Sequence, residues 1–96
     1  MYRVFSYDGK SESILDKLIS DDRVQTLSIT RREGKDLGID GKIVIIEGND
    51  EKMKEVFKAV DFSFLKEIND DKKRLIYEKV KEENDEAAGG LGFVFQ

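Results

Sequence analysis

Lys42-Ile43-Val44-Ile45-Ile46-Glu47 is the stretch of this sequence that decides the fold. Its four consecutive β-branched residues are poorly suited to a short helix and favour a strand. A strand that is apolar on both faces is typical of the middle of a sheet that is covered on both sides. The stretch therefore predicts a central strand at residues 42–47.

The segments around this central strand carry further strand patterns. Aromatic and β-branched residues alternate with polar ones, or form short apolar runs, in each of these segments. On this basis we predict additional strands at residues 2–7, 24–31, 62–68 and 91–95.

Three segments between the strands have apolar residues at helical spacing, and each is preceded by a residue that can cap a helix. The first helix is predicted to follow Ser11 or Ser13, and the second to follow Asn49 or Asp50. The third is predicted over residues 70–88, and Gly89-Gly90 is expected to end it.

The predicted order of elements is β-α-β-β-α-β-α-β, which indicates a single α+β domain over residues 1–96. Its first six elements match the split βαβ, ferredoxin-like arrangement. Right-handed crossovers in that arrangement place the helices on one face of the sheet. We therefore expect one mixed or antiparallel sheet with helices packed on one face, and an extra helix and strand added to the βαββαβ core.

The composition excludes several classes of function. The 17 basic and 21 acidic residues give a net charge of −4, which suits duplex DNA poorly because phosphate contacts need excess Lys and Arg. No apolar stretch is long enough to cross a membrane and no signal-peptide pattern opens the chain, so a cytoplasmic protein without a membrane or nucleic-acid partner is expected. The absence of Cys and the abundance of Lys, Glu and Asp also resemble the composition of thermophilic proteins.

The chain contains neither His nor Cys. Ser-His-Asp relays, Cys nucleophiles and thiolate zinc sites are therefore excluded, and any bound metal must be held by oxygen. An enzyme would need a carboxylate pair, a lysine or a bound Mg²⁺, and no spacing selects such a set. We therefore predict that the protein is not an enzyme.

One acidic loop carries the only chemical signal in the sequence. Residues 36–47 can be aligned with the twelve-position EF-hand calcium loop, with Asp36 at position 1, Asp40 at position 5, Gly41 at position 6 and Glu47 at position 12. Position 3 is Gly38 and supplies no ligand. The alignment predicts Asp36, Asp40 and Glu47 as ligands of a weakly bound Ca²⁺ ion, with Mg²⁺ as the alternative.

A plain turn is the competing interpretation of this loop. Asp40-Gly41 between two strand patterns favours a hairpin turn that needs no ion. If residues 43–46 are extended, Glu47 lies on the order of 20 Å along the chain from Asp40, at about 3.3 Å per residue. Glu47 then shares an ion with Asp40 only if another segment brings them together.

The general layout of the chain, together with the loop at residues 36–47, resembles a small α+β family from methanogenic archaea to which calcium binding has been attributed. The resemblance implies a small calcium-binding protein, in agreement with the loop, for which a weak-affinity buffer or a sensor would both fit. It implies no cellular role.

A second function follows from the predicted fold alone. Small βαββαβ domains have free edge strands that pair readily with another chain. The alternative to a calcium-binding protein is therefore a non-catalytic interaction module that self-associates through a sheet edge.

Overall fold

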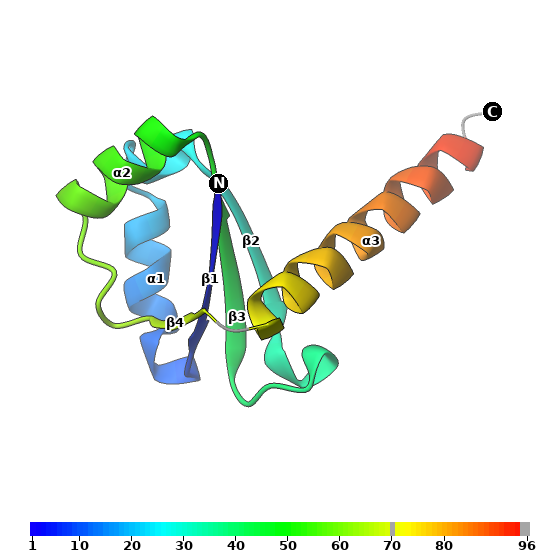
Figure 1. The fold of residues 1–96 in the computed structure, drawn as a ribbon, viewed down its shortest axis with the longest axis horizontal. Coiled ribbons are helices and arrows are strands. Elements are labelled where there is room, and N and C mark those ends of the chain that lie inside the picture. The colour runs from blue at the N-terminus through cyan, green and yellow to red at the C-terminus, as the bar shows by residue number, and fades with distance from the viewer. Residues whose placement is uncertain (70, 95–96) are drawn as a thin grey trace.

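The computed structural model describes the backbone of residues 1–69 and 71–94, and the side chains of residues 1–69 and 71–83. The described chain is an α+β fold in which three helices pack against one antiparallel sheet of four strands (Figure 1). The strands are β1 (Tyr2–Tyr7), β2 (Ser28–Glu33), β3 (Lys42–Glu47) and β4 (Lys66–Ile68). The helices are α1 (Glu12–Ile19), α2 (Asp50–Ala59) and α3 (Asp71–Val94).

The strand order in the sheet is β2-β3-β1-β4, and each pair of neighbours is antiparallel. β3 is an inner strand, as its sequence predicts, and the four residues Ile43, Val44, Ile45 and Ile46 are at most 3% exposed. β2 and β4 form the two edges. β2 pairs with β3 along all six of its residues, whereas β4 has only three residues.

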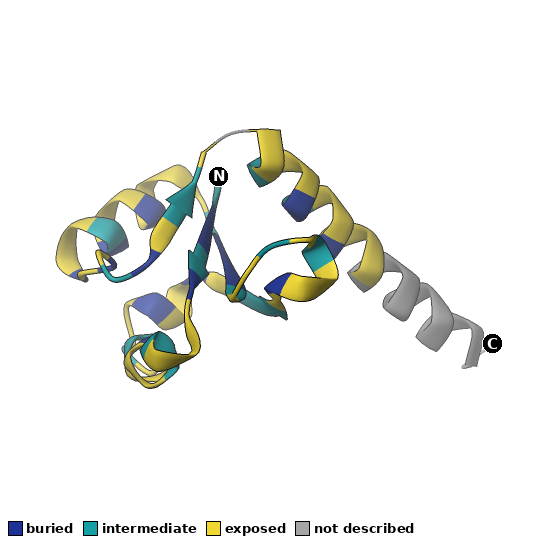
Figure 2. Ribbon diagram, turned by 90° about the horizontal axis from the view of Figure 1, so that it is seen from below, coloured by how far each residue is buried: buried dark blue, intermediate teal, exposed yellow. Residues whose placement is uncertain are grey.

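The sheet is covered on both faces, and a separate apolar cluster lies on each. Val44 and Ile46 belong to the cluster that packs against Leu15 of α1 and Met53 of α2. The opposite cluster joins β1 and β3 to α3, and its buried members are Val4, Ile43, Ile45, Ile76 and Val80. Figure 2 shows buried positions on the strands and on the helix surfaces that meet them. The expectation that all helices share one face is therefore wrong for α3.

Two short polar residues fix the entries to α1 and α2. The Asn49 side chain accepts a hydrogen bond of 2.8 Å from the backbone N–H of Lys52, which is the expected N-cap. At the first helix Asp8 accepts from the backbone N–H of Ser11 and holds a short 3-10 turn, Gly9–Ser11. Ser11 then begins α1 without a side-chain cap of its own.

The strand predicted at residues 24–31 begins later than expected. Val24–Thr26 is a 3-10 turn, and the strand starts at Ser28. Val24 and Leu27 are both buried because a 3-10 turn places residues three apart on the same side. The alternation of apolar and polar residues therefore corresponds to a strand only from Ser28 onward. The strand predicted at residues 62–68 is likewise limited to Lys66–Ile68.

The C-terminal strand predicted at residues 91–95 is also wrong, because α3 continues through Gly89-Gly90 to Val94. Phe95 lies outside the described residues. Each glycine within a helix costs only about 1 kcal/mol relative to alanine, so a glycine pair weakens a helix without necessarily ending it.

Candidate functional site

The loop between β2 and β3 is a compact turn closed by its own backbone. The N–H of Gly34 donates to the carbonyl of Gly41 at 2.9 Å, and the N–H of Ile39 donates to the carbonyl of Gly34 at 2.8 Å. Gly38 and Gly41 have φ values of 72° and 86°, in the left-handed region that favours glycine. A Cβ at Gly34 would lie 2.5 Å from two backbone oxygens. The glycines of this loop therefore have structural reasons that require no ion.

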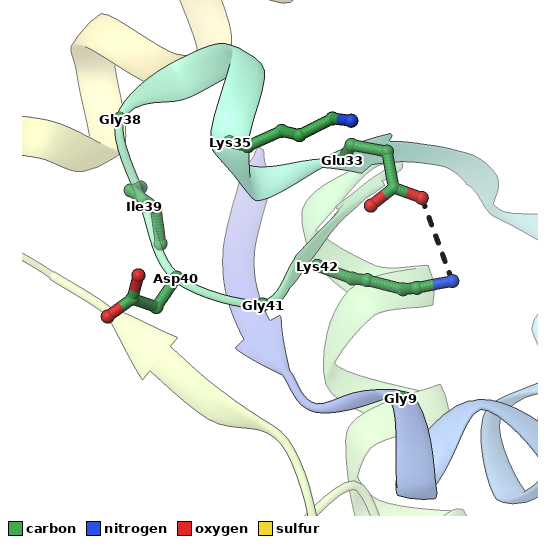
Figure 3. A pocket seen from close by; sticks show the side chains of 8 residues that line it. All are labelled: Gly9, Glu33, Lys35, Gly38, Ile39, Asp40, Gly41 and Lys42. Atoms are coloured by element: carbon green, nitrogen blue, oxygen red, sulfur yellow. Dashed lines mark ion pairs between the residues drawn. The ribbon is translucent and has the colours of Figure 1, made fainter.

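The loop carries two of the three predicted calcium ligands, Asp36 and Asp40, and both are exposed. Asp40 borders an open hollow of about 540 Å³. Its carboxylate points away from the side chains of Glu33 and Lys42 in the same hollow, which form an ion pair of 3.7 Å (Figure 3). Asp36 lies in the 3-10 turn Gly34–Leu37, and its backbone carbonyl accepts a hydrogen bond of 3.0 Å from Lys79 of α3.

The third predicted ligand, Glu47, lies at the opposite end of β3 from this loop. Its carboxylate accepts a hydrogen bond of 2.6 Å from the hydroxyl of Tyr77 on α3. The ring of Tyr77 stacks on Tyr2 with 3.8 Å between ring centroids. The hydrogen bond to Glu47, and secondarily burial, raise the pKa of Tyr77 to about 12 because the neutral hydroxyl is favoured. Glu47 thus attaches α3 to the sheet.

The described residues contain no group of three acidic side chains that could hold a metal ion. The fold keeps Glu47 at one end of β3, and Asp36 and Asp40 beyond the other end. Calcium binding by Asp36 and Asp40 consequently stays a prediction that rests on the loop sequence.

Next to the loop, a network of ion pairs connects β2 and β3 to α1. Arg31 contacts Asp16 at 2.7 Å and Glu12 at 3.0 Å, and its Nε donates to the hydroxyl of Tyr7 at 3.3 Å. Lys42 contacts Glu12 at 2.7 Å, and this hydrogen bond raises the pKa of Lys42. These contacts hold the Arg31 side chain on the α1 face of the sheet.

A further ion pair, which no sequence pattern predicts, joins β1 to β4. Arg3 makes two hydrogen bonds to the carboxylate of Glu67 and lies 4.1 Å from the ring centroid of Phe57. The bonds from Arg3 lower the pKa of Glu67. Arg3 lies two residues from Phe5 on β1 and therefore shares its face, which α2 covers, but nothing in the sequence identifies its partner 64 residues away.

The outer edge of β2 has no strand beside it among the described residues. In an antiparallel pair, every second residue turns both backbone groups toward the neighbouring strand. The bonds from Gly34 to Gly41 and from Gly48 to Met1 continue the ladders on either side of β3 and fix this alternation. Accordingly, Ile29, Arg31 and Glu33 direct their backbone N–H and C=O groups away from the sheet.

Two contacts of Arg32 lie near this edge. Its Nη1 donates to the backbone carbonyl of Arg31 at 2.8 Å, and its Nε lies 3.7 Å from Glu83 of α3. A carbonyl oxygen has two lone pairs, so the carbonyl of Arg31 can accept a second hydrogen bond. The edge therefore keeps a hydrogen-bonding row that another strand can use.

No family model, curated protein or solved structure matches this chain in comparisons with known proteins. Within the described residues, every helix is too short or too polar to cross a lipid bilayer. The geometry of the described residues therefore defines the candidate site, and the open edge of β2 is the feature with the clearest binding chemistry.

Proposed function

We propose that the protein is a non-catalytic interaction module that self-associates by adding a strand to the open edge of β2. The observation that supports this proposal is the outward row of backbone groups at Ile29, Arg31 and Glu33. Strand addition uses such a row for affinity, and the alternating side chains provide specificity.

The two sheet edges differ in how well they are protected. Natural proteins protect edges by keeping them short, by placing proline or charge on them, or by covering them. β4 is short, with three residues. β2 has six residues in unbroken register and no proline, and ion pairs hold its charged side chains, Arg31 to α1, Arg32 to Glu83 of α3 and Glu33 to Lys42 of β3. β2 is consequently the edge better suited to pairing.

Sedimentation velocity of the full chain, with a Glu33→Pro variant, tests this proposal. Glu33 has φ −74°, which proline adopts without strain, and its N–H points outward. The substitution thus preserves the bonds between β2 and β3 but removes one outward donor from each copy. At about 1 kcal/mol per hydrogen bond, the loss of two bonds should weaken the dimer by a factor of about 30.

Glu33→Ala is the matched control, because it removes the same side chain and its ion pair with Lys42 but keeps the N–H. We expect this variant to dimerise as the unaltered chain does. A chain that stays monomeric at millimolar concentration would contradict the proposal. Equal dimerisation of Glu33→Pro and Glu33→Ala would place the interface elsewhere.

We also propose that β1–β4 with α1 and α2 form the split βαβ, ferredoxin-like core, to which α3 is an addition. This proposal is supported by the strand order, because β3 lies between β1 and β2 while β1 lies between β3 and β4. Two interleaved βαβ units require that order, and right-handed crossovers place both connecting helices on one face, as α1 and α2 lie here. An experimental structure with a left-handed crossover would contradict it.

A further inference from the structure

We infer that the occupant of the β2 edge is the β2 strand of a second copy, paired antiparallel about a two-fold axis that passes at Thr30. This inference rests on the proposed function and adds the identity of the partner strand and its register. It follows from the alternation of β2, from the charges on the strand, and from the course of α3.

The alternation of side chains limits the possible registers. In a continuous sheet, a residue must lie opposite one whose side chain is on the same face, because a shift of one residue reverses the faces. For the six residues of β2, this condition leaves two registers in which five residues of each copy are paired. One register has its axis at Thr30 and the other at Arg31.

Charge distinguishes the two registers. With the axis at Arg31, that residue lies directly opposite its own copy, and like charges in opposite positions are destabilising. Arg31 cannot turn aside easily because Asp16 and Glu12 hold it on the α1 face. With the axis at Thr30, Thr30 meets Thr30, Ile29 meets Arg31, and Ser28 meets Arg32. Just beyond these five positions the N–H of Glu33 lies opposite the extended Leu27, whose outward carbonyl can accept its hydrogen bond. No like charges are opposed.

The backbone chemistry of the Thr30 register is also complementary. Ile29 and Arg31 both direct their backbone groups outward, and in this register each lies opposite the other in the second copy. Such a pair exchanges both of its backbone hydrogen bonds, and the symmetry creates the pair twice. The carbonyl of Arg31 accepts one of these bonds in addition to the bond from Arg32.

The position of α3 independently favours the same register. α3 crosses the sheet toward β2, since Tyr77 contacts Tyr2 and Glu47 whereas Glu83 contacts Arg32. The helix continues to Val94 and extends beyond the edge strand β2, as Figure 1 shows. Pairing through β2 therefore brings the two α3 helices toward each other across the seam, the line along which the two β2 strands would pair. Packed helices need about 8–10 Å between their axes.

The Arg32 contacts mark where each α3 meets the seam. With the axis at Thr30, the two Arg32 positions are four residues apart along the seam, or about 13 Å at about 3.4 Å per residue. With the axis at Arg31, they are two residues apart, or about 7 Å. The Thr30 register therefore leaves the two helices more room.

Disulfide cross-linking tests the register, because the chain has no cysteine and any introduced cysteine is unique. In the Thr30 register, Thr30 forms a pair whose Cα atoms are about 4.5 Å apart, within the range that a disulfide bridges. Thr30→Cys should therefore form a covalent dimer under mild oxidation. Ser28→Cys, on the same face of the same strand, is the matched control. Its two copies are about 13 Å apart along the seam, and it should cross-link at least about tenfold more slowly.

Sedimentation of both variants under reducing conditions distinguishes a wrong register from a chain that does not self-associate. A covalent dimer from Thr30→Cys but not from Ser28→Cys supports the register. Dimers that sediment as such but cross-link equally well, or poorly, at both positions overturn the register and leave edge pairing in place. Monomers at every concentration overturn the proposed function itself.

Discussion

Replacement of Tyr77 by phenylalanine should detach one polar anchor of α3 while keeping its ring. The hydroxyl of Tyr77 donates to the carboxylate of Glu47 at 2.6 Å, and its pKa is raised to about 12 from the ordinary 10.0. The rise of the Tyr77 pKa from 10.0 to about 12 corresponds to at most about 2.7 kcal/mol, which partial exposure to solvent reduces to about 1–2 kcal/mol. Hydrogen bonds to charged groups give a similar range, about 1.5–3 kcal/mol.

Urea unfolding at pH 7 measures this loss directly. We expect Tyr77→Phe to lower the free energy of unfolding by about 1–2 kcal/mol, which in a domain of this size corresponds to a decrease in Tm of roughly 4–16 °C. Tyr2→Phe is the matched control, because it removes a hydroxyl from the same ring stack and leaves the bond to Glu47. An unchanged free energy of unfolding in Tyr77→Phe would refute the assignment of Glu47 as an anchor of α3.

The same bond has a defined pH dependence. A raised pKa means that the folded state retains the phenolic proton more strongly, so the contribution is complete below pH 10 and decreases as the pH rises toward about 12. The difference in stability between the unaltered chain and Tyr77→Phe should therefore narrow over this interval. A constant difference from pH 9 to pH 11.5 would contradict the linkage.

Three further substitutions or additions test other parts of the structure. Gly34→Ala places a Cβ 2.5 Å from two backbone oxygens and should cost more than about 2 kcal/mol in urea unfolding, whereas Gly9→Ala, with nothing within 4 Å, should cost far less. Glu67→Gln should flatten the acid loss of stability below about pH 4.5, because a lowered pKa gives stability that disappears as the pH falls; an equally steep acid limb would contradict this. The calcium prediction expects amide shifts in residues 36–47 that saturate at roughly millimolar CaCl₂ and vanish when Asp36 and Asp40 are both replaced by Asn; no shift at several millimolar CaCl₂ would end it.

Features set by local pattern could be predicted from the sequence. The run at residues 42–47 needs apolar cover on both faces, so its place inside the sheet follows from its composition. The Asn49 cap follows from the preference of helix N-termini for short polar side chains, and α2 begins where that rule places it.

Features set by tertiary contacts could not be predicted in this way. The apolar stripe of α3 indicates that Ile76 and Val80 face a sheet, but the periodicity does not say which face. That choice depends on how the chain leaves β4. The strand prediction for residues 24–27 is wrong for a different reason. The buried pair Val24 and Leu27 fits a 3-10 turn as well as an apolar strand.

The candidate site shows the same division. Its turn at residues 34–41 is signalled by glycine spacing, which the sequence displays. The bonds of Glu47 to Tyr77 and of Arg3 to Glu67 join residues 30 and 64 positions apart, and no spacing rule links such pairs. The sequence pattern therefore assigns Glu47 to the nearest acidic loop, although its hydrogen-bond partner Tyr77 lies on α3.

Amide hydrogen exchange on the unaltered chain tests edge pairing most directly, because it reports on the backbone groups of β2 one by one. Thr30 donates its N–H toward β3 and should be protected at every protein concentration, whereas the amides of Ile29 and Arg31 face outward. We predict that protection at Ile29 and Arg31 rises with concentration as the dimer forms. Exchange of these two amides at unprotected rates, even at millimolar concentration, would contradict strand pairing at this edge.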